Sequence, residues 1–134
     1  MVLVSSCLVG INCRYDGKNS KNEEFASMVE SGEAVAVCPE TAGGLSTPRK
    51  PCEIREGRVF NIEGEDLTEN FVKGGNLTLE LCKIFNIEKC YLKSNSPSCG
   101  CGTVYDGTFT GKKIEGNGIT AEILLKNGIE VISV

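Results

Sequence analysis

Three apolar runs, each leading into a cysteine-bearing turn, constrain the fold of this chain more than any other feature. The runs cover residues 2–6, 34–37 and 90–92. Cys7 and Cys38 directly follow the first two runs, and Cys99 lies in the loop that follows the third. If the runs are parallel strands of one sheet, their carboxyl ends share the edge at which α/β proteins place their ligands. The sequence therefore predicts that three thiols converge on one crevice.

Helical patterns separate these strands, as a parallel sheet requires. Apolar residues at i, i+3 and i+4 predict a helix over residues 22–30, and a last helix is predicted over residues 118–125. Thr68 can cap a longer helix that continues to about residue 86, although the glycine pair at 74–75 weakens its first turns. Four parallel strands are thus predicted, at residues 2–6, 34–38, 89–93 and 129–134. The prediction is one compact α/β domain over residues 1–134, with a mainly parallel sheet and ligand loops at the strand carboxyl ends.

Two segments of the chain are predicted to be irregular and one to be a hairpin. Residues 93–102 are rich in Ser, Gly and Pro, and residues 39–51 are rich in Gly and Pro and long enough to suggest function. Residues 52–61 are two short strand patterns around Glu56-Gly57, which is a hairpin signal. Residues 105–108 are predicted to form a turn.

The length and charge of the chain disfavour several classes of protein. Its 134 residues carry 14 Lys and Arg against 18 Asp and Glu, a formal charge of −4, with no basic tract longer than a pair. Nucleic acid is therefore a disfavoured partner, because phosphate binding needs a cationic footprint. No apolar stretch approaches the roughly 18 residues of a membrane span, and the N-terminus has no signal-peptide pattern. We therefore expect a cytoplasmic protein without a membrane partner.

The chain has eight cysteines and no histidine, which narrows the chemistry available to it. In a reducing cytosol, cysteines are expected to serve as metal ligands or reactive thiols rather than to form disulfides. The lack of histidine excludes Ser-His and Cys-His dyads. Cys82 and Cys90 fall on apolar faces and are expected in the core, and Cys52 is expected to be structural at a hairpin edge. The three strand-end cysteines form no C-x-x-C pair and are a weak signal for zinc. They suit a [4Fe-4S] cluster with one open iron, with buried cysteines as the alternative.

Four blocks of the sequence resemble the signature blocks of the thiouracil desulfidase family. They are CLVG…CRYDG (7–17), CPE…GGL…PRKP (38–51), KSNSPSCG (93–100) and YDGTF (105–109), in the family's order and across nearly the whole chain. The resemblance implies a cytoplasmic, Rossmann-like domain that holds an oxygen-sensitive [4Fe-4S] cluster by three cysteines and removes sulfur from thiouracil without net redox change. Larger relatives carry an extra domain and act on thiolated tRNA. Without that domain, the expected substrate is a small thiolated pyrimidine.

The family's functional residues fall on specific positions of this chain. The resemblance implies cluster ligands at Cys7, Cys38 and Cys99, a catalytic carboxylate at Glu40 and a catalytic serine at Ser96. Glu40 lies two residues from a ligand and could activate water as a general base. Ser96 could position that water or relay a proton, or it could be a simple turn residue.

Arg14, Asp16 and Arg49 lie in the loops of the predicted ligand edge. Their side chains could hydrogen-bond the carbonyl and N–H groups of a pyrimidine, or they could brace the loops against one another. Cys13 lies in the first block at a position that some relatives fill with other residues, so it is not expected to be a ligand. The alternative to an enzyme is an iron-sulfur or zinc protein for sulfur or metal handling or sensing, in which Glu40 would be dispensable.

Overall fold

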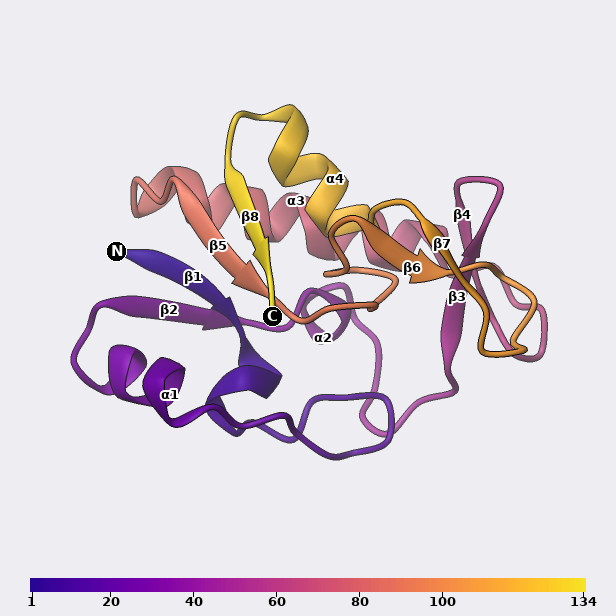
Figure 1. Cartoon of the computed structure of the whole chain (residues 1–134), viewed down its shortest axis with the longest axis horizontal. Helices are drawn as coiled ribbons and strands as arrows, with labels where there is room; N and C mark the ends of the chain where they lie inside the picture. The colour runs from indigo at the N-terminus through magenta and orange to yellow at the C-terminus, as the bar shows by residue number, and fades with distance from the viewer.

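The computed structural model describes residues 1–134 and is built around a four-stranded sheet (Figure 1). Its strands are, in spatial order, β2 (Ala34–Val37), β1 (Val2–Ser5), β5 (Lys89–Leu92) and β8 (Glu130–Ser133). Each strand is parallel to its neighbours. The predicted α/β class and the four predicted strands are therefore confirmed, and the carboxyl ends of these strands share one edge.

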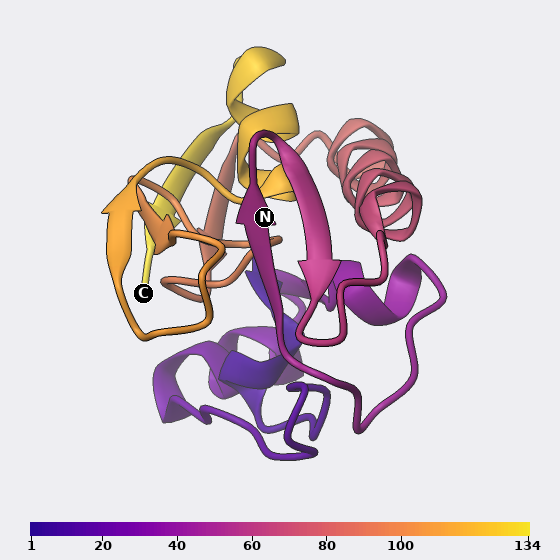
Figure 2. The ribbon, with the colours of Figure 1, turned by 90° about the vertical axis from the view of Figure 1, so that its right-hand side faces the viewer.

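Helices cover both faces of the sheet (Figure 2). They are α1 (Glu23–Glu30) on one face, and α3 (Thr68–Ile84) and α4 (Ile119–Lys126) on the other. Phe25 of α1 packs in one core with Val4, whereas Cys82 of α3 packs in the other core with Leu3. Leu3 and Val4 of β1 enter different cores because successive residues of a strand point to opposite faces. None of the helices is both long enough and apolar enough to cross a bilayer.

Two small antiparallel hairpins lie beyond the carboxyl ends of the main strands (Figure 1). β3 (Cys52–Arg55) pairs with β4 (Arg58–Asn61), and β6 (Thr103–Tyr105) pairs with β7 (Lys113–Glu115). The sequence predicts the first hairpin but only a turn at the second. β6 and β7 have three residues each, which is shorter than the four to eight residues over which an alternation of apolar and polar residues indicates a strand.

Residues 39–51 are predicted to be irregular, and this prediction is wrong for the first four of them. They form the helical turn α2 (Pro39–Ala42). Pro39 takes the first helical position, where its fixed φ and missing N–H are tolerated. Cys38 is the N-cap of this turn, so β2 ends one residue earlier than predicted. The residues after β1, where a cysteine-bearing turn is predicted, likewise form a 3-10 helix, η1 (Ser6–Val9), so β1 also ends one residue earlier than predicted.

The first turns of α3 also differ from the prediction. Leu67 takes the N-cap position, and Thr68 is the first helical residue. Gly74 is a point of close contact rather than a weak point of the helix, because a Cβ there would lie 1.8 Å from the carbonyl oxygen of Pro39. The missing side chain lets α2 pack directly on α3. That contact positions the residues that follow Cys38.

Gly74→Ala is expected to lower the free energy of unfolding by about 1–3 kcal/mol, because the added methyl group overlaps the Pro39 carbonyl and α2 must move. Helix propensity alone would give the opposite sign, since Ala is about 1 kcal/mol more favourable than Gly inside a helix. Urea denaturation measures the change. Lys73→Ala, at an exposed position of the same helix, should stay within about 0.5 kcal/mol of wild type. A stabilised Gly74→Ala protein would contradict the packing argument.

Candidate active site

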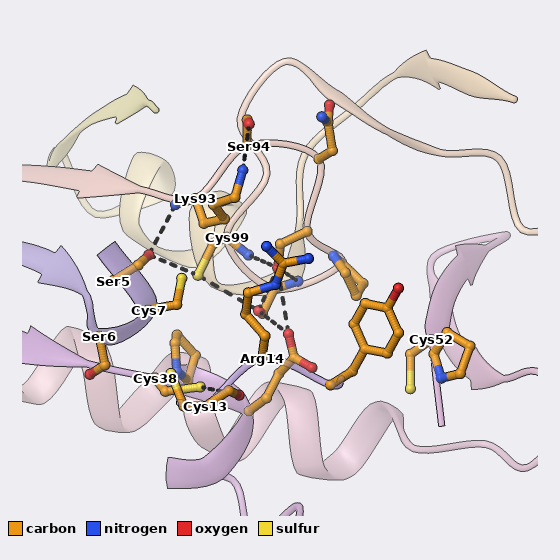
Figure 3. A pocket seen from close by; sticks show the side chains of 18 of the residues that line it. Ser5, Ser6, Cys7, Cys13, Arg14, Cys38, Cys52, Lys93, Ser94 and Cys99 are labelled. Carbon is orange, nitrogen blue, oxygen red and sulfur yellow. Dashed lines mark hydrogen bonds between the residues drawn. The ribbon is translucent and has the colours of Figure 1, made fainter. Parts of the chain in front are cut away.

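A cavity of about 350 Å³ lies at the carboxyl ends of β1, β2 and β5 (Figure 3). Its walls come from residues 5–7, 13–15, 38–40, 51–53 and 93–99, together with Tyr105. These segments are distant in sequence and meet because the parallel strands end at one edge. The cavity occupies the crevice that the sequence predicts.

Cys7, Cys38 and Cys99 all line this cavity. Cys7 lies in η1 directly after β1, Cys38 caps α2 after β2, and Cys99 lies in the loop after β5 (Figure 3). Cys7 and Cys99 are buried, and Cys38 is partly buried. The hydroxyl of Ser5 donates a hydrogen bond to Cys99 Sγ at 3.4 Å. The structure therefore brings together the three thiols that the sequence predicts to be ligands.

Cys13 adds a fourth thiol to this group. It lines the cavity, and its backbone oxygen accepts a hydrogen bond from Cys38 Sγ at 3.8 Å. Hydrogen bonding to the Cys13 thiol raises the pKa of Cys38, whereas the same thiol lowers the pKa of Cys7. Burial raises the pKa of Cys99 to about 12. Cys38 and Cys99 are therefore held as thiols unless a cation compensates the charge of the thiolate, as a metal centre does.

The donor set fits an iron-sulfur cluster better than a single metal ion. No group of three Cys, Asp or Glu side chains is placed to hold one ion. The cysteines of a cluster bind different iron atoms, so they are spaced more widely than the ligands of one ion. Three thiols without an imidazole are the soft donors that iron-sulfur clusters use.

Glu40 reaches the cavity from the first turn of α2. Its side chain is 12% exposed, and both of its carboxylate oxygens accept hydrogen bonds. Oε1 accepts from Arg49 Nε at 3.0 Å, and Oε2 accepts from Ser98 Oγ at 2.8 Å. Ser96 Oγ lies 3.5 Å from the same Oε2. The two residues predicted to be catalytic are neighbours, but Ser98, which the sequence analysis does not single out, is closer to Glu40.

Of the three residues predicted to bind the substrate or to brace the loops, only Arg14 lines the cavity. Asp16 accepts a hydrogen bond from Arg14 Nη2 at 3.3 Å. Arg49 binds Glu40, and its Nη2 donates to the backbone oxygen of Cys13 at 2.9 Å. Arg49 thus links the segments that carry Glu40 and Cys13, whereas both partners of Asp16, Arg14 and Lys18, lie within its own loop.

The cavity also has wall residues that the sequence analysis does not assign to the site, namely Tyr15, Cys52, Glu53, Lys93 and Tyr105. Glu53 Oε1 accepts hydrogen bonds from the backbone N–H groups of Gly107 and Phe109, at 3.0 and 3.1 Å. These bonds tie β3 to the loop after β6. Cys52, which the sequence predicts to be structural at a hairpin edge, also lies in the cavity wall. The only sequence signal for the two tyrosines is that they belong to the first and fourth motif blocks.

Comparisons with known proteins extend over nearly the whole chain. The sequence profile of the 2-thiouracil desulfurase family matches residues 2–134. The uncharacterised protein YbbK of Bacillus subtilis (strain 168) is 46% identical over 143 residues, which cover 99% of this chain and 95% of YbbK. The solved structure of a [4Fe-4S]-dependent thiouracil desulfidase, TudS, matches with a TM-score of 0.94 and 41% sequence identity, covering 98% of this chain and 89% of that one.

Proposed function

The chain belongs to the 2-thiouracil desulfurase family, and from this premise we propose that it is a [4Fe-4S]-dependent desulfidase that converts thiouracil or a related thiolated pyrimidine to uracil and sulfide. One observation carries the proposal beyond family membership. Cys7, Cys38 and Cys99 line the same cavity as Glu40, so a metal centre and a proton acceptor would face one substrate. A protein that only stores or senses a cluster has no need of that carboxylate.

The thiolates of Cys7, Cys38 and Cys99 would hold the cluster. Three cysteines leave one iron of a [4Fe-4S] cluster without a protein ligand. When bound, the cluster supplies a soft Lewis acid suited to the sulfur of a thiocarbonyl.

The walls of the cavity suit a single pyrimidine ring. Its volume of about 350 Å³ is at the small end of ligand pockets, which run from about 300 to 1,000 Å³, and a cluster held by the three thiols would take part of it, so the remaining space favours a single ring. Tyr15 and Tyr105 provide aromatic side chains against which a flat heterocycle can pack. The guanidinium of Arg14 can donate hydrogen bonds to a ring carbonyl oxygen. These residues would hold the ring with its thiocarbonyl toward the thiols.

Glu40 would act as the general base of the reaction. Water adds to the thiocarbonyl carbon, forming a C–O bond while the π electron pair of C=S moves to sulfur and Glu40 accepts one of the two water protons. The remaining C–S bond then breaks as C=O forms, and the sulfur leaves with the other proton as hydrosulfide. Glu40 releases its proton to solvent. The sum is hydrolysis of C=S to C=O, with no electron donor or acceptor consumed.

Anaerobically reconstituted protein is expected to turn 2-thiouracil into uracil and sulfide in equal amounts, whereas protein stripped of iron should not. Loss of thiouracil absorbance and direct assay of sulfide measure the reaction. In water enriched in ¹⁸O, the heavy oxygen should enter the uracil carbonyl, because the proposed reaction takes its oxygen from water. A fully loaded cluster without turnover of any thiolated pyrimidine would favour the storage or sensing alternative.

A further inference from the structure

The carboxylate of Glu40 is held from both sides. Arg49 binds Oε1 and Ser98 binds Oε2, at 3.0 and 2.8 Å. The side chains of Arg49 and Glu40 are 8% and 12% exposed, and Ser98 is 1% exposed. Two bonds on different oxygens fix the plane of a carboxylate, which one bond does not.

Ser98 makes the shorter of the two serine hydrogen bonds to the carboxylate, because Ser98 Oγ lies 2.8 Å from Oε2 and Ser96 Oγ lies 3.5 Å from it. Ser96 Oγ accepts from the backbone N–H groups of Ser98 and Cys99, at 3.1 and 3.0 Å, so its own proton is free to be donated. Ser98 Oγ lies 2.9 Å from Ser96 Oγ and donates to Glu40 Oε2. Because a hydroxyl has one proton, Ser96 can then donate to Ser98 or, over the longer distance of 3.5 Å, to Glu40 itself.

Both partners of Glu40 are themselves fixed by the fold. The guanidinium of Arg49 also donates to the backbone oxygens of Cys13 and Ser46, at 2.9 and 3.2 Å. The backbone oxygen of Ser98 accepts from the N–H of Ala121, in the first turn of α4, at 3.1 Å. The two holders of Glu40 are thus anchored to different parts of the molecule.

We propose that Ser98 and Arg49 are positioning residues that hold the Glu40 carboxylate in place, so that it presents its remaining lone pairs to the cavity. This inference rests on the proposed function for the role of Glu40 as a base. A carboxylate oxygen has about two acceptor positions, and each oxygen uses one of them for its holder. A base displaced by about 1 Å can cost on the order of 10²-fold in rate.

Ser98→Ala is expected to lower kcat by about tenfold to 10²-fold, with KM within about threefold of wild type and iron content unchanged. The matched control is Ser5→Ala. Ser5 is a buried serine that donates to Cys99 Sγ at 3.4 Å, similar to the 3.7 Å between Ser98 Oγ and the same sulfur, but it makes no hydrogen bond to Glu40. Its kcat should fall at least about tenfold less than that of Ser98→Ala, because only Ser98 acts through the carboxylate. Equal losses in the two variants would assign the effect to Cys99 and overturn the proposal.

A double variant separates positioning from a general structural role. If Ser98 acts only through Glu40, adding Ser98→Ala to Glu40→Gln should cause little further loss of kcat. Additive losses would overturn the proposal. Arg49→Lys provides a second line of evidence, because it keeps the charge but cannot donate to Glu40, Cys13 and Ser46 together, so kcat should fall more than KM rises.

A crystal structure of Ser98→Ala tests the positioning without any assay. The Glu40 carboxylate should turn away from the orientation that it has in wild type, and an unchanged carboxylate would overturn the inference. If wild type fails to desulfurate thiouracil, the proposed function fails, and the crystal structure still decides whether Ser98 holds Glu40.

Discussion

Replacing Glu40 by glutamine is expected to lower the desulfuration rate by about 10²-fold or more while the cluster content stays at the wild-type level, because the variant loses the proposed general base and none of the proposed metal ligands. Glutamine keeps the shape of the side chain. Its amide oxygen can still accept from Arg49, and its NH₂ group can donate to Ser98, so the buried hydrogen bonds can be remade. The chain has no histidine to take over the proton transfer.

Anaerobic turnover of thiouracil, normalised to iron content, measures this effect. The control is Glu53→Gln, since Glu53 is the other carboxylate that lines the cavity. Both of its hydrogen bonds, to the N–H groups of Gly107 and Phe109, go to a single oxygen that an amide retains. Its rate should therefore exceed that of Glu40→Gln by at least about tenfold. Undiminished turnover by Glu40→Gln would move the role of base to another group. Glu53 would be the first to test, because it is the other carboxylate in the cavity wall.

Replacing Cys7, Cys38 or Cys99 by alanine is expected to abolish desulfuration and to prevent assembly of a stable cluster. Each change removes one of only three proposed ligands. The chain has no histidine whose imidazole could replace the lost thiolate. Iron and sulfide analysis after anaerobic reconstitution, together with the visible absorption of the cluster, measures the loss.

Two further cysteine variants make this experiment specific. Cys82→Ala removes a buried thiol that lies 3.7 Å from Cys90, outside the cavity, and should keep full iron. Cys13→Ala is the stricter comparison, because Cys13 lines the cavity without belonging to the predicted ligand set. It should also keep its iron. Iron retained in a Cys38→Ala protein but lost in Cys13→Ala would show that the ligands have been assigned to the wrong thiols.

The sheet could be predicted from sequence because its strands are short apolar runs separated by helical patterns. Parallel strands with one common edge then require the loops that carry Cys7, Cys38 and Cys99 to meet, so the predicted crevice follows from topology. The helical turn α2 was harder to predict, since Gly and Pro are frequent in its surroundings and only Pro39 marks its start. The strands of the β6–β7 hairpin are only three residues long, too short for an alternating pattern to indicate them.

The partners of Glu40 could not be predicted for a different reason. Ser98 is 58 positions away along the chain, and its local sequence indicates only a turn. Arg49 is nine positions away, yet neither helical nor strand spacing brings it to Glu40, because an irregular segment joins them. Hydrogen bonds of this kind depend on how loops fold back, and sequence periodicity carries no information about that.

The contact between α2 and α3 depends on the missing side chain of Gly74, and through this contact Gly74 affects the cavity indirectly. Gly74 contributes no polar group and does not line the cavity, but Pro39, whose carbonyl occupies the space beside it, does. Exposed positions of α3 can carry larger side chains without touching α2. Position 74 leaves no room for a side chain, because a Cβ there would press on the carbonyl oxygen of Pro39, in the turn that carries Glu40. The absence of a side chain at position 74 thus helps to keep the turn that carries Glu40 in place.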